Sequence, residues 1–381
     1  MIEQPAIMWK PTQEQHDSSR LWDFRNWVAE TTGKELNDYR QIWRWSVDEL
    51  STFWDSVRRY FGVIGANFTG PVYQADRFTT TRWYPMATVN FAENVLKYAQ
   101  DQSMRDHTAI LRVEEDNSTS AITWGELESK VAALAAYFRR QGIVPGDRIG
   151  AVLPNIPEAL IGLLAAASVG AIWTINSPDL APAASLARLS QLEPKILFTT
   201  DGYEFNGKWH DKVADRSEIL HQLPSVVASV VVSSNLTSGP KETCETTYHQ
   251  ALFSDIVEKE ATPEYERVPF NHPLWVLFSS GTTGAPKGIV HSHGGMLLEA
   301  LKGTGLNQDM GPGDRYYVAA NTSWMVWNTL VNNMAAGASV VTYSGSPMFG
   351  HKDRQFEIIQ NTGVTMFATG AAYLTVVEKS G

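Results

Sequence analysis

Cysteine is almost absent from this chain, and the single residue, Cys244 among 381, excludes an intramolecular disulfide. It also excludes a zinc site built from several cysteines. Glu242 and Glu245 lie close to Cys244 in the sequence and would disfavour a reactive thiolate. We therefore expect Cys244 to be an unreactive surface residue.

An excess of positive charge is also missing. Lys and Arg total 31 against 41 Asp and Glu, so the net charge is −10. This balance argues against nucleic acid or an anionic membrane as the main partner, but an anionic small substrate needs only a local positive site. The longest apolar stretch, residues 159–175, is broken by Gly170 and predicts a buried helix leading into a strand, not a membrane span. No secretion signal is visible at the N-terminus, and we expect a cytoplasmic protein.

The most informative segment, residues 279–288, follows an apolar run at 274–278 that predicts a buried strand. A short loop rich in Gly, Ser and Thr after a strand can turn several backbone N–H groups toward one point, which suits phosphate oxygens. Lys287 adds a positive charge. The segment differs from the common nucleotide P-loop, in which a glycine is followed by four residues and then by Gly-Lys-Ser/Thr. An ordinary polar surface loop is the alternative. The segment reads Ser279-Ser280-Gly281-Thr282-Thr283-Gly284-Ala285-Pro286-Lys287-Gly288.

Residues 1–105 differ from the rest in their density of tryptophan. Apolar residues at near-helical spacing predict helices at 18–31 and 46–61, the second opening with a capping box at Ser46 to Glu49. Aromatic residues at this spacing more often form a core than a carbohydrate- or base-stacking surface. We expect such a core here, formed in part by Trp22, Phe24, Trp27, Phe53 and Trp54.

From residue 106 to 381 strand and helix patterns alternate, which predicts parallel strands joined by helical crossovers. The expected fold class is α/β, with layered parallel-sheet subdomains and flanking helices, preceded by the Trp-rich helical segment. A capping box at Thr123 and Glu126 opens one of the helices. The polar stretch 233–267 predicts an irregular connection. Strands are expected at 109–113, 148–153, 171–175, 195–199, 316–320, 339–343 and 364–368, and helices at 123–141, 157–168, 182–192, 296–302, 329–336, 354–360 and 371–379.

Residues 279–288 match every fixed position of the phosphate-loop signature of the adenylate-forming superfamily, and the chain resembles its acyl-CoA synthetases, luciferases and adenylation domains. The resemblance runs along essentially the whole chain and is strongest to the acetoacetyl-CoA synthetase branch. The segments that carry this branch resemblance are 311–316, 321–327, 343–347 and 367–374, while 83–85 and 90–96 resemble the leading segment shared by acetyl-, propionyl- and acetoacetyl-CoA synthetases.

The resemblance implies an ATP-dependent acid–thiol ligase that activates acetoacetate as an acyl-adenylate and transfers it to CoA, releasing pyrophosphate and AMP. ATP, Mg²⁺ and CoA are the implied cofactors and co-substrates, with Mg²⁺ as counter-ion to the triphosphate and no dedicated metal site on the protein. Lys287 is the implied catalytic residue. The β- and γ-phosphates would be held by Ser279, Ser280, Gly281, Thr282, Thr283, Gly284 and Lys287.

The resemblance also suggests where the acid and CoA bind. Trp324, Met325 and Val326 would line the acyl pocket, with core residues following a strand as the alternative. A polar partner for a keto oxygen could come from the preceding residues 321–323. Lys208 would contact a CoA phosphate, although Phe205 stands where the family usually has arginine, and a solvated surface lysine is the alternative.

Two histidines, His291 and His293, follow the phosphate loop and invite a metal or acid–base interpretation. No carboxylate or third ligand is spaced to join them, so we expect packing or solvent roles.

Three parts of the family pattern are missing: the adenine-binding motif, the ribose-binding aspartate and the small C-terminal domain with its lysine. We therefore expect the chain to be the N-terminal portion of a longer ligase and to be inactive alone. Two alternatives remain open. One is a short-chain synthetase for acetate, propionate or butyrate, and the other is a naturally short, non-catalytic relative that binds a nucleotide or a protein partner.

Overall fold

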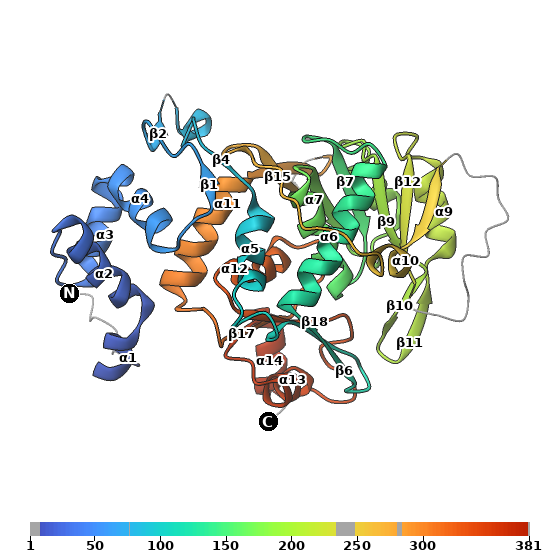
Figure 1. The fold of residues 1–381 in the computed structure, drawn as a ribbon. Helices are drawn as coiled ribbons and strands as arrows, with labels where there is room; N and C mark the ends of the chain where they lie inside the picture. Colours follow the sequence, from blue (N-terminus) through green and yellow to red (C-terminus); the bar gives the residue numbers. More distant parts are fainter. Residues whose placement is uncertain (1–7, 76, 234–247, 280–283, 380–381) are drawn as a thin grey trace.

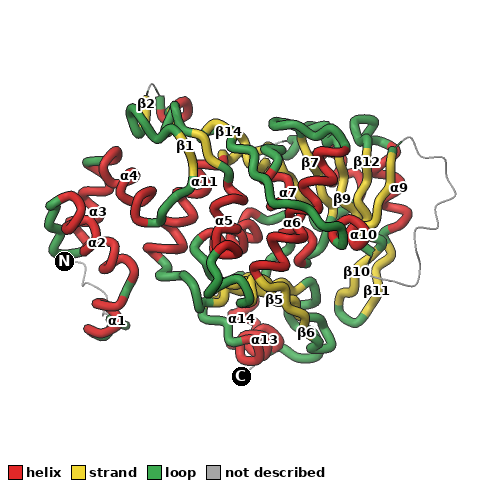
Figure 2. Tube along the Cα trace, viewed as in Figure 1, coloured by secondary structure: helices red, strands yellow, loops and turns green. Residues whose placement is uncertain are grey.

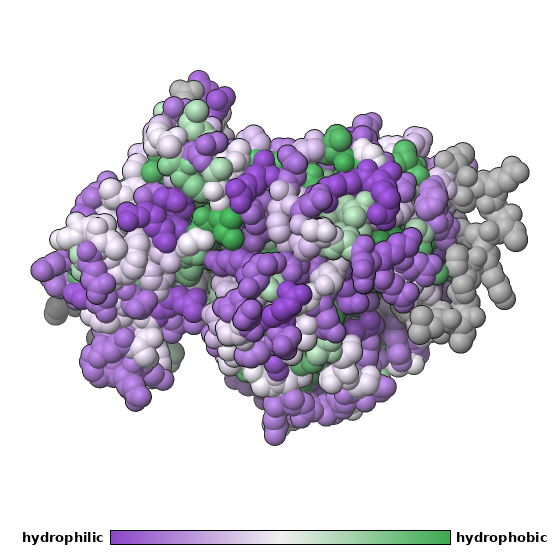
Figure 3. All heavy atoms as spheres, in the orientation of Figure 1, coloured by the Kyte–Doolittle hydropathy of each residue, from purple (hydrophilic) through white to green (hydrophobic). Residues whose placement is uncertain are grey.

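The structure is a computed structural model that describes residues 8–75, 77–233, 248–279 and 284–379. Helices gather at the N-terminal end of the molecule, and two large sheets with their helices make up the remainder (Figures 1 and 2). The face drawn in Figure 3 is mostly hydrophilic, and its apolar residues form small separate patches. Cys244 lies outside the described residues.

The N-terminal helices form an aromatic core, as the sequence predicts. Phe24 is fully buried, and its ring lies within 6.3 Å of the rings of Trp45 and Phe53. The expected capping box at Ser46 is wrong, because Ser46 lies inside α3, where its hydroxyl donates to the Trp43 carbonyl. The elements of this region are α1 (Gln13–Ser18), α2 (Arg20–Thr32), α3 (Tyr39–Asp48), α4 (Leu50–Tyr60), β1 (Gly65–Ala66), β2 (Tyr73–Gln74), η1 (Phe78–Thr80), β3 (Arg82–Trp83), β4 (Thr88–Val89) and α5 (Phe91–Gln100).

The larger sheet has seven strands in the order β13-β12-β9-β7-β8-β15-β16. All neighbours are parallel except the edge strand β16, which pairs antiparallel with β15. Parallel neighbouring strands need crossover connections, which here consist largely of helices. The elements are β7 (Arg148–Val152), β8 (Ile172–Asn176), β9 (Ile196–Thr200), β12 (Ala228–Val232), β13 (His249–Leu252), β15 (Pro273–Ser279) and β16 (Lys287–Ser292).

The smaller sheet has five strands in the order β19-β17-β18-β5-β6, and only β6 is antiparallel to its neighbour. The sequence pattern did not predict β6, because most of its residues are polar and none of them is buried. The elements are β5 (Thr108–Val113), β6 (Thr119–Thr123), β17 (Arg315–Val318), β18 (Ser339–Tyr343) and β19 (Met366–Ala368).

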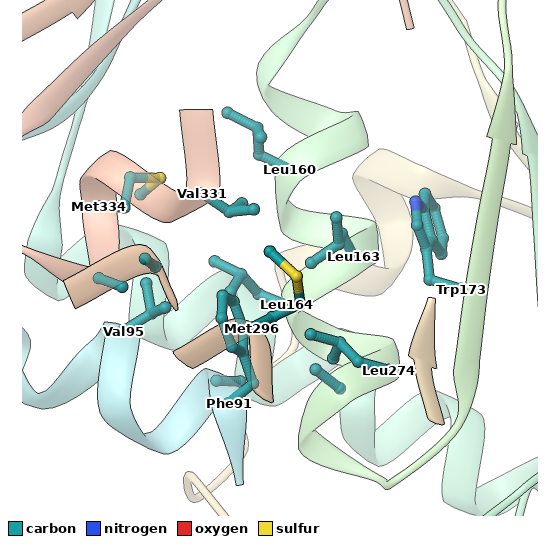
Figure 4. Packing of buried hydrophobic residues seen from close by; sticks show 14 of the residues in the cluster. Phe91, Val95, Leu160, Leu163, Leu164, Trp173, Leu274, Met296, Val331 and Met334 are labelled. Atoms are coloured by element: carbon teal, nitrogen blue, oxygen red, sulfur yellow. The ribbon is translucent and has the colours of Figure 1, made fainter. Parts of the chain in front are cut away.

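A layer of helices lies between the two sheets and carries the main hydrophobic core. Helix α7 contacts both β8 of the larger sheet and β5 of the smaller one. Figure 4 shows Leu160, Leu163 and Leu164 of α7 among side chains from α5, β8, β15, α11 and α12. Thr123 and Glu126 form the predicted capping box of α6. The layer and its extensions comprise α6 (Trp124–Arg140), α7 (Pro157–Ser168), α11 (His293–Ala300), the π-helical η2 (Leu301–Asn307), η3 (Met325–Asn328) and α12 (Thr329–Ala335).

Helices also cover the outer faces of both sheets. On the larger sheet, Leu189 and Ile219 pack with Val152 and Leu197, the strand residues that point away from the central layer. On the smaller sheet, Ile358 packs with Val341 and other outward residues. The outer helices are α8 (Pro182–Leu189), α9 (Val213–His221), α13 (Arg354–Thr362) and α14 (Ala371–Lys379). The predicted α/β class with layered parallel sheets and flanking helices is confirmed.

The expected irregular connection at 233–267 is partly wrong. Its described part contains β13, which extends the seven-stranded sheet, and the short helix α10 (Phe253–Val257). Strand β14 (Val268–Pro269) follows and joins β4 and β1 in a small sheet. The polar composition hid these elements because β13 is an edge strand that only half buries its residues. The division expected at residue 105 stays a prediction.

Candidate functional site

A cavity of about 330 Å³ lies where strands from both large sheets end. Ligands of open α/β sheets bind beyond the carboxyl ends of the strands. Here the segments after β7, β8, β17 and β18 all reach the same cavity, and the residues after β9 add one more wall. The lining residues are Pro154, Asn155, Ser177, Pro178, Asp179, Tyr203, Phe205, Tyr317, Ala319, Ala320, Asn321, Tyr343, Ser344, Gly345 and Pro347.

The cavity lining is almost without charge. Asp179 is the one charged residue among the described lining residues, and it is exposed at the rim. Burial raises the pKa of the Tyr317 and Tyr343 phenols, so both stay neutral at physiological pH. A lining of this kind suits an uncharged or weakly polar part of a ligand. The phosphates of a nucleotide would need a separate positive site.

The segment after β15 provides a candidate for that positive site. Strand β15 is parallel to β8, so its carboxyl end, Ser279, lies at the same edge of the sheet as the cavity. Lys287 begins β16, pairs with Ser279 across the hairpin and exposes its side chain. The Gln191 side chain donates to the Pro286 carbonyl at 3.0 Å, and Gly284 has a φ of +112° that disfavours a side chain there.

Four members of the predicted phosphate loop, Ser280, Gly281, Thr282 and Thr283, lie outside the described residues. Ser279 and Lys287 pair at the carboxyl end of β15, as a phosphate site there would require, and Gly284 precedes Lys287 by three residues. The phosphate-binding roles of all seven residues stay predictions.

The residues expected to bind the acid divide into two groups. Thr322 is buried and donates its hydroxyl to the Leu153 carbonyl at 2.7 Å, while the Ser323 hydroxyl accepts from the Ser177 N–H at 2.7 Å. These bonds attach the segment to the ends of β7 and β8. Asn321 lines the cavity, and its side-chain oxygen accepts from the Ser323 N–H. Of the three polar candidates, Asn321 therefore has the most capacity left for a ligand, through its amide NH₂.

Trp324, Met325 and Val326 form the second group and expose 65%, 51% and 40% of their surface. They are not core residues, and none of them lies among the described residues that line the cavity. Their role as acyl-pocket residues stays a prediction. The next residue, Trp327, is fully buried and donates its ring N–H to the Asn155 side chain at 2.9 Å. Asn155 is a lining residue that the sequence analysis did not identify.

Lys208 lies in a β-hairpin that was not predicted from the sequence. Strands β10 (Gly202–Phe205) and β11 (Lys208–Asp211) are joined by a two-residue turn, Asn206-Gly207. Asn-Gly is the strongest short-range hairpin signal, so the sequence did contain this information. The Lys208 side chain is exposed and pairs across the hairpin with Phe205, a cavity residue. Its contact with a CoA phosphate stays a prediction.

The hairpin turn is held by Glu115, a second residue that the sequence analysis missed. The Glu115 carboxylate is buried and accepts from the main-chain N–H groups of Asn206 at 2.7 Å, Gly207 at 2.6 Å and Ser346 at 2.6 Å. We call this carboxylate and its three N–H partners the Glu115 clamp. It connects the smaller sheet, which carries Glu115 after β5, to the hairpin that follows β9 of the larger sheet.

His291 and His293 have packing roles, in line with the prediction. The Trp275 ring N–H donates to His291 Nδ1 at 3.1 Å. His293 is fully buried, and its Nδ1 accepts from the Phe91 N–H at 3.2 Å.

The described residues contain no group of three or more His, Cys, Asp or Glu side chains placed to hold a metal ion. Nor does any described helix combine the length and apolarity needed to span a membrane.

His293 makes the stability of the fold depend on pH. Burial, with a contribution from His272, lowers the pKa of His293 from 6.5 to about 3. The unfolded chain therefore binds a proton between these values that the folded chain does not, and stability falls as pH decreases through this window. We expect His293→Asn to reduce the pH slope of the unfolding free energy between pH 6 and 4 by about 1.4 kcal/mol per pH unit. Urea unfolding at several pH values measures it, and an unchanged slope would contradict the assignment.

Comparison with known proteins places this geometry in a family. The sequence model described as "AMP-binding enzyme" matches residues 97–380, a range that includes the cavity and the segment after β15. The chain belongs to the AMP-binding enzyme family.

Individual relatives agree with the family. The chain is 36% identical to an acetoacetyl-coenzyme A synthetase of Rhizobium meliloti over 98% of its length and 56% of that protein. A malonamoyl-CoA synthetase, vrtB of Penicillium aethiopicum, is 32% identical over 98% of this chain and 54% of its own length. The solved structure of acetoacetyl-CoA synthetase from Streptomyces lividans superposes with a TM-score of 0.94 at 41% identity, covering 99% of this chain and 57% of that one. The chain thus spans about half the length of the relatives it matches.

Proposed function

We propose that this chain provides the first part of the site of an ATP-dependent acid–thiol ligase that converts acetoacetate and CoA to acetoacetyl-CoA. The single observation that carries the proposal is the placement of Ser279 and Lys287 at the strand edge that also holds the nearly uncharged cavity. The phosphates and the acid would therefore meet at one edge of the sheet. The similarity to acetoacetyl-CoA synthetases over 98–99% of the chain supports this choice of substrates.

The proposed reaction has two steps. A carboxylate oxygen of the acid attacks the α-phosphorus of ATP, and the bond to the leaving pyrophosphate breaks. The CoA sulfur, having lost its proton, then attacks the acyl carbonyl carbon, and AMP leaves. Both steps bring anions together, so positioning and charge stabilisation are what the protein must supply. Lys287 would stabilise the charge of the β- and γ-phosphates, and the cavity would hold uncharged groups of the acid or CoA.

Mg²⁺ would be held by the triphosphate itself. The described residues offer no cluster of three or more ligands for it, and Mg²⁺ in such sites is typically bound by substrate phosphates with one or two carboxylates. The ion would supply positive charge to the phosphate oxygens. Sequence beyond this chain would supply the adenine and ribose contacts and a C-terminal domain with a second lysine. We place the complete enzyme in the cytoplasm.

The acids named for the acetoacetyl-CoA and malonamoyl-CoA synthetases suggest which class of acid the site accepts. Acetoacetate and malonamate both carry a carbonyl group at the carbon next to the CH₂ that bears the carboxylate. We infer that the site recognises this 3-oxo group and that Asn321 is a candidate donor to it, because its amide NH₂ is not used by Thr322 or Ser323. A site that hydrogen-bonds a carbonyl rejects an analogue that lacks it far better than an apolar pocket can.

The test uses a chimera in which residues 1–381 of this chain precede the remaining C-terminal part of the Streptomyces lividans protein. Acid-dependent exchange of labelled pyrophosphate into ATP is measured with acetoacetate, malonamate, butyrate and acetate. We expect both 3-oxo acids to exceed butyrate by about a hundredfold or more in kcat/KM. Butyrate or acetate activated as well as acetoacetate would replace the proposed substrate with another short acid.

A further inference from the structure

A two-residue hairpin turn leaves main-chain N–H groups without partners in the hairpin itself. Asn206 and Gly207 both have positive φ values, 54° and 68°, as a type I′ turn requires. The strand pairing ends at Phe205 and Lys208, so the N–H groups of the two turn residues point away from the ladder. Unpaired N–H groups need another acceptor or water. The Glu115 carboxylate accepts from both of them.

The chemistry of the clamp requires a carboxylate. All three partners of Glu115 are N–H donors, from Asn206, Gly207 and Ser346. A carboxylate only accepts, whereas a glutamine of the same size would direct its NH₂ group toward a donor. Bonds from N–H groups to a charged acceptor are roughly twice as strong as neutral ones.

Gly345 leaves room for the Glu115 side chain, and Arg354 fixes the main chain of Glu115. A Cβ atom added to Gly345 would lie 2.3 Å from Glu115 Cγ, so a side chain at this position would displace the clamp. The buried Arg354 guanidinium donates to the Glu114 carbonyl at 2.7 Å and to the Glu115 carbonyl at 3.2 Å. Arg354 therefore holds the Glu115 main chain, and the Glu115 carboxylate holds the hairpin turn.

The clamp acts directly on the shape of the cavity. Tyr203 and Phe205 line it from the hairpin, and Tyr343 and Gly345 line it from the smaller sheet. Figure 1 shows the β10–β11 hairpin extending beyond the larger sheet, on the side of the molecule where the smaller sheet lies. The clamp joins the turn to the smaller sheet by hydrogen bonds to one carboxylate.

We propose that Glu115 is a positioning residue that fixes the β10–β11 hairpin as a wall of the ligand cavity, and that CoA affinity depends on this contact. The second half rests on the proposed function, because it identifies CoA as a ligand at the hairpin that carries Lys208. Without the clamp, the hairpin turn loses its hydrogen bonds to the smaller sheet. The cavity then loses the fixed position of Tyr203 and Phe205.

The first experiment is amide hydrogen exchange of the 381-residue chain, comparing the wild type with Glu115→Gln. We expect exchange at Asn206 and Gly207 to become about tenfold faster or more, with segments such as β7 and α7 unchanged. Glu204→Gln is the matched control, because Glu204 lies exposed on the same hairpin and its substitution changes the charge equally. Equal exchange of the turn amides in wild type and Glu115→Gln would overturn the positioning role.

The second experiment is a calorimetric titration with CoA of the chimera and of the same variants made in the chimera. We expect Glu115→Gln to weaken binding at least fivefold and Glu204→Gln to leave it within twofold. Gly345→Ala, which displaces the clamp without removing its charge, should accelerate turn exchange as Glu115→Gln does, and its failure to do so would count against the clamp. Faster exchange with unchanged CoA affinity would overturn the coupling to CoA. A wild-type chimera that does not bind CoA would refute the CoA part of the proposed function, while the exchange result still decides the role of Glu115.

Discussion

Lys287→Ala is expected to slow acyl-adenylate formation by about a hundredfold or more, the usual effect of removing one positioned group that stabilises developing charge. Lys287 lies opposite Ser279 at the end of β15 and exposes its side chain, so a bound triphosphate could reach it. The positive charge of Lys287 acts in the first half-reaction, in which ATP is the substrate and pyrophosphate leaves. Thioester formation from supplied acetoacetyl-adenylate involves no β- or γ-phosphate, and we expect it to change less than about threefold.

Both half-reactions are measured in the chimera, the first by pyrophosphate exchange and the second by single-turnover release of AMP from the supplied adenylate. Lys259→Ala is the control, because Lys259 is an exposed lysine that does not line the cavity. Equal slowing of the two half-reactions in Lys287→Ala would show that the lysine maintains the structure of the site and does not act on the departing phosphates.

Arg354→Ala is expected to lower the free energy of unfolding by about 3–5 kcal/mol, the range for removing one partner of a buried charged network. The Arg354 side chain is 2% exposed. It donates to the Glu114 and Glu115 carbonyls, to the Asn117 side chain and to Glu357 at 2.9 Å. Alanine would remove this donor from the Glu114 and Glu115 carbonyls, leave the Glu114 carbonyl with the Asn117 N–H as its partner, and open a cavity beneath the loop that carries the clamp.

Urea unfolding of the 381-residue chain measures this effect. Arg40→Ala is the matched control, since Arg40 is an exposed arginine on the solvent side of α3 and we expect a change within about 0.5 kcal/mol. A loss below about 1 kcal/mol for Arg354→Ala would mean that water replaces the guanidinium without penalty. The network would then not be what holds the strand ends of the smaller sheet.

The sequence predicted those elements whose signals are local. Helix α7 begins at Pro157, a residue suited to the first helical position, and α6 begins after the Thr123–Glu126 capping box. The predicted strand at 339–343 is confirmed residue for residue, because β18 is buried on both faces and reads as a continuous run of β-formers. Ser46 shows the limit of local signals: the same capping pattern fell inside a helix because α3 begins earlier, at Tyr39.

The candidate site was predictable only in part. The segment 279–288 combines special residues in one string, so a local pattern was enough to identify it. Glu115 had no such pattern, because its partners Asn206, Gly207 and Ser346 are 91, 92 and 231 residues away. Asn155 depends in the same way on Trp327, which is 172 residues distant. Such contacts arise when the strand ends of two sheets meet, and a single sequence does not show which loops will face each other.

The measurement that tests the central claim most directly follows an oxygen label. Acetoacetate with ¹⁸O in its carboxylate is supplied to the chimera together with ATP, Mg²⁺ and CoA, and the products are examined by mass spectrometry. If the carboxylate attacks the α-phosphorus, one labelled oxygen leaves with AMP, and the pyrophosphate carries none. Label in inorganic phosphate with ADP as the nucleotide product, or AMP formed without label, would contradict the acyl-adenylate route and with it the assignment of this site.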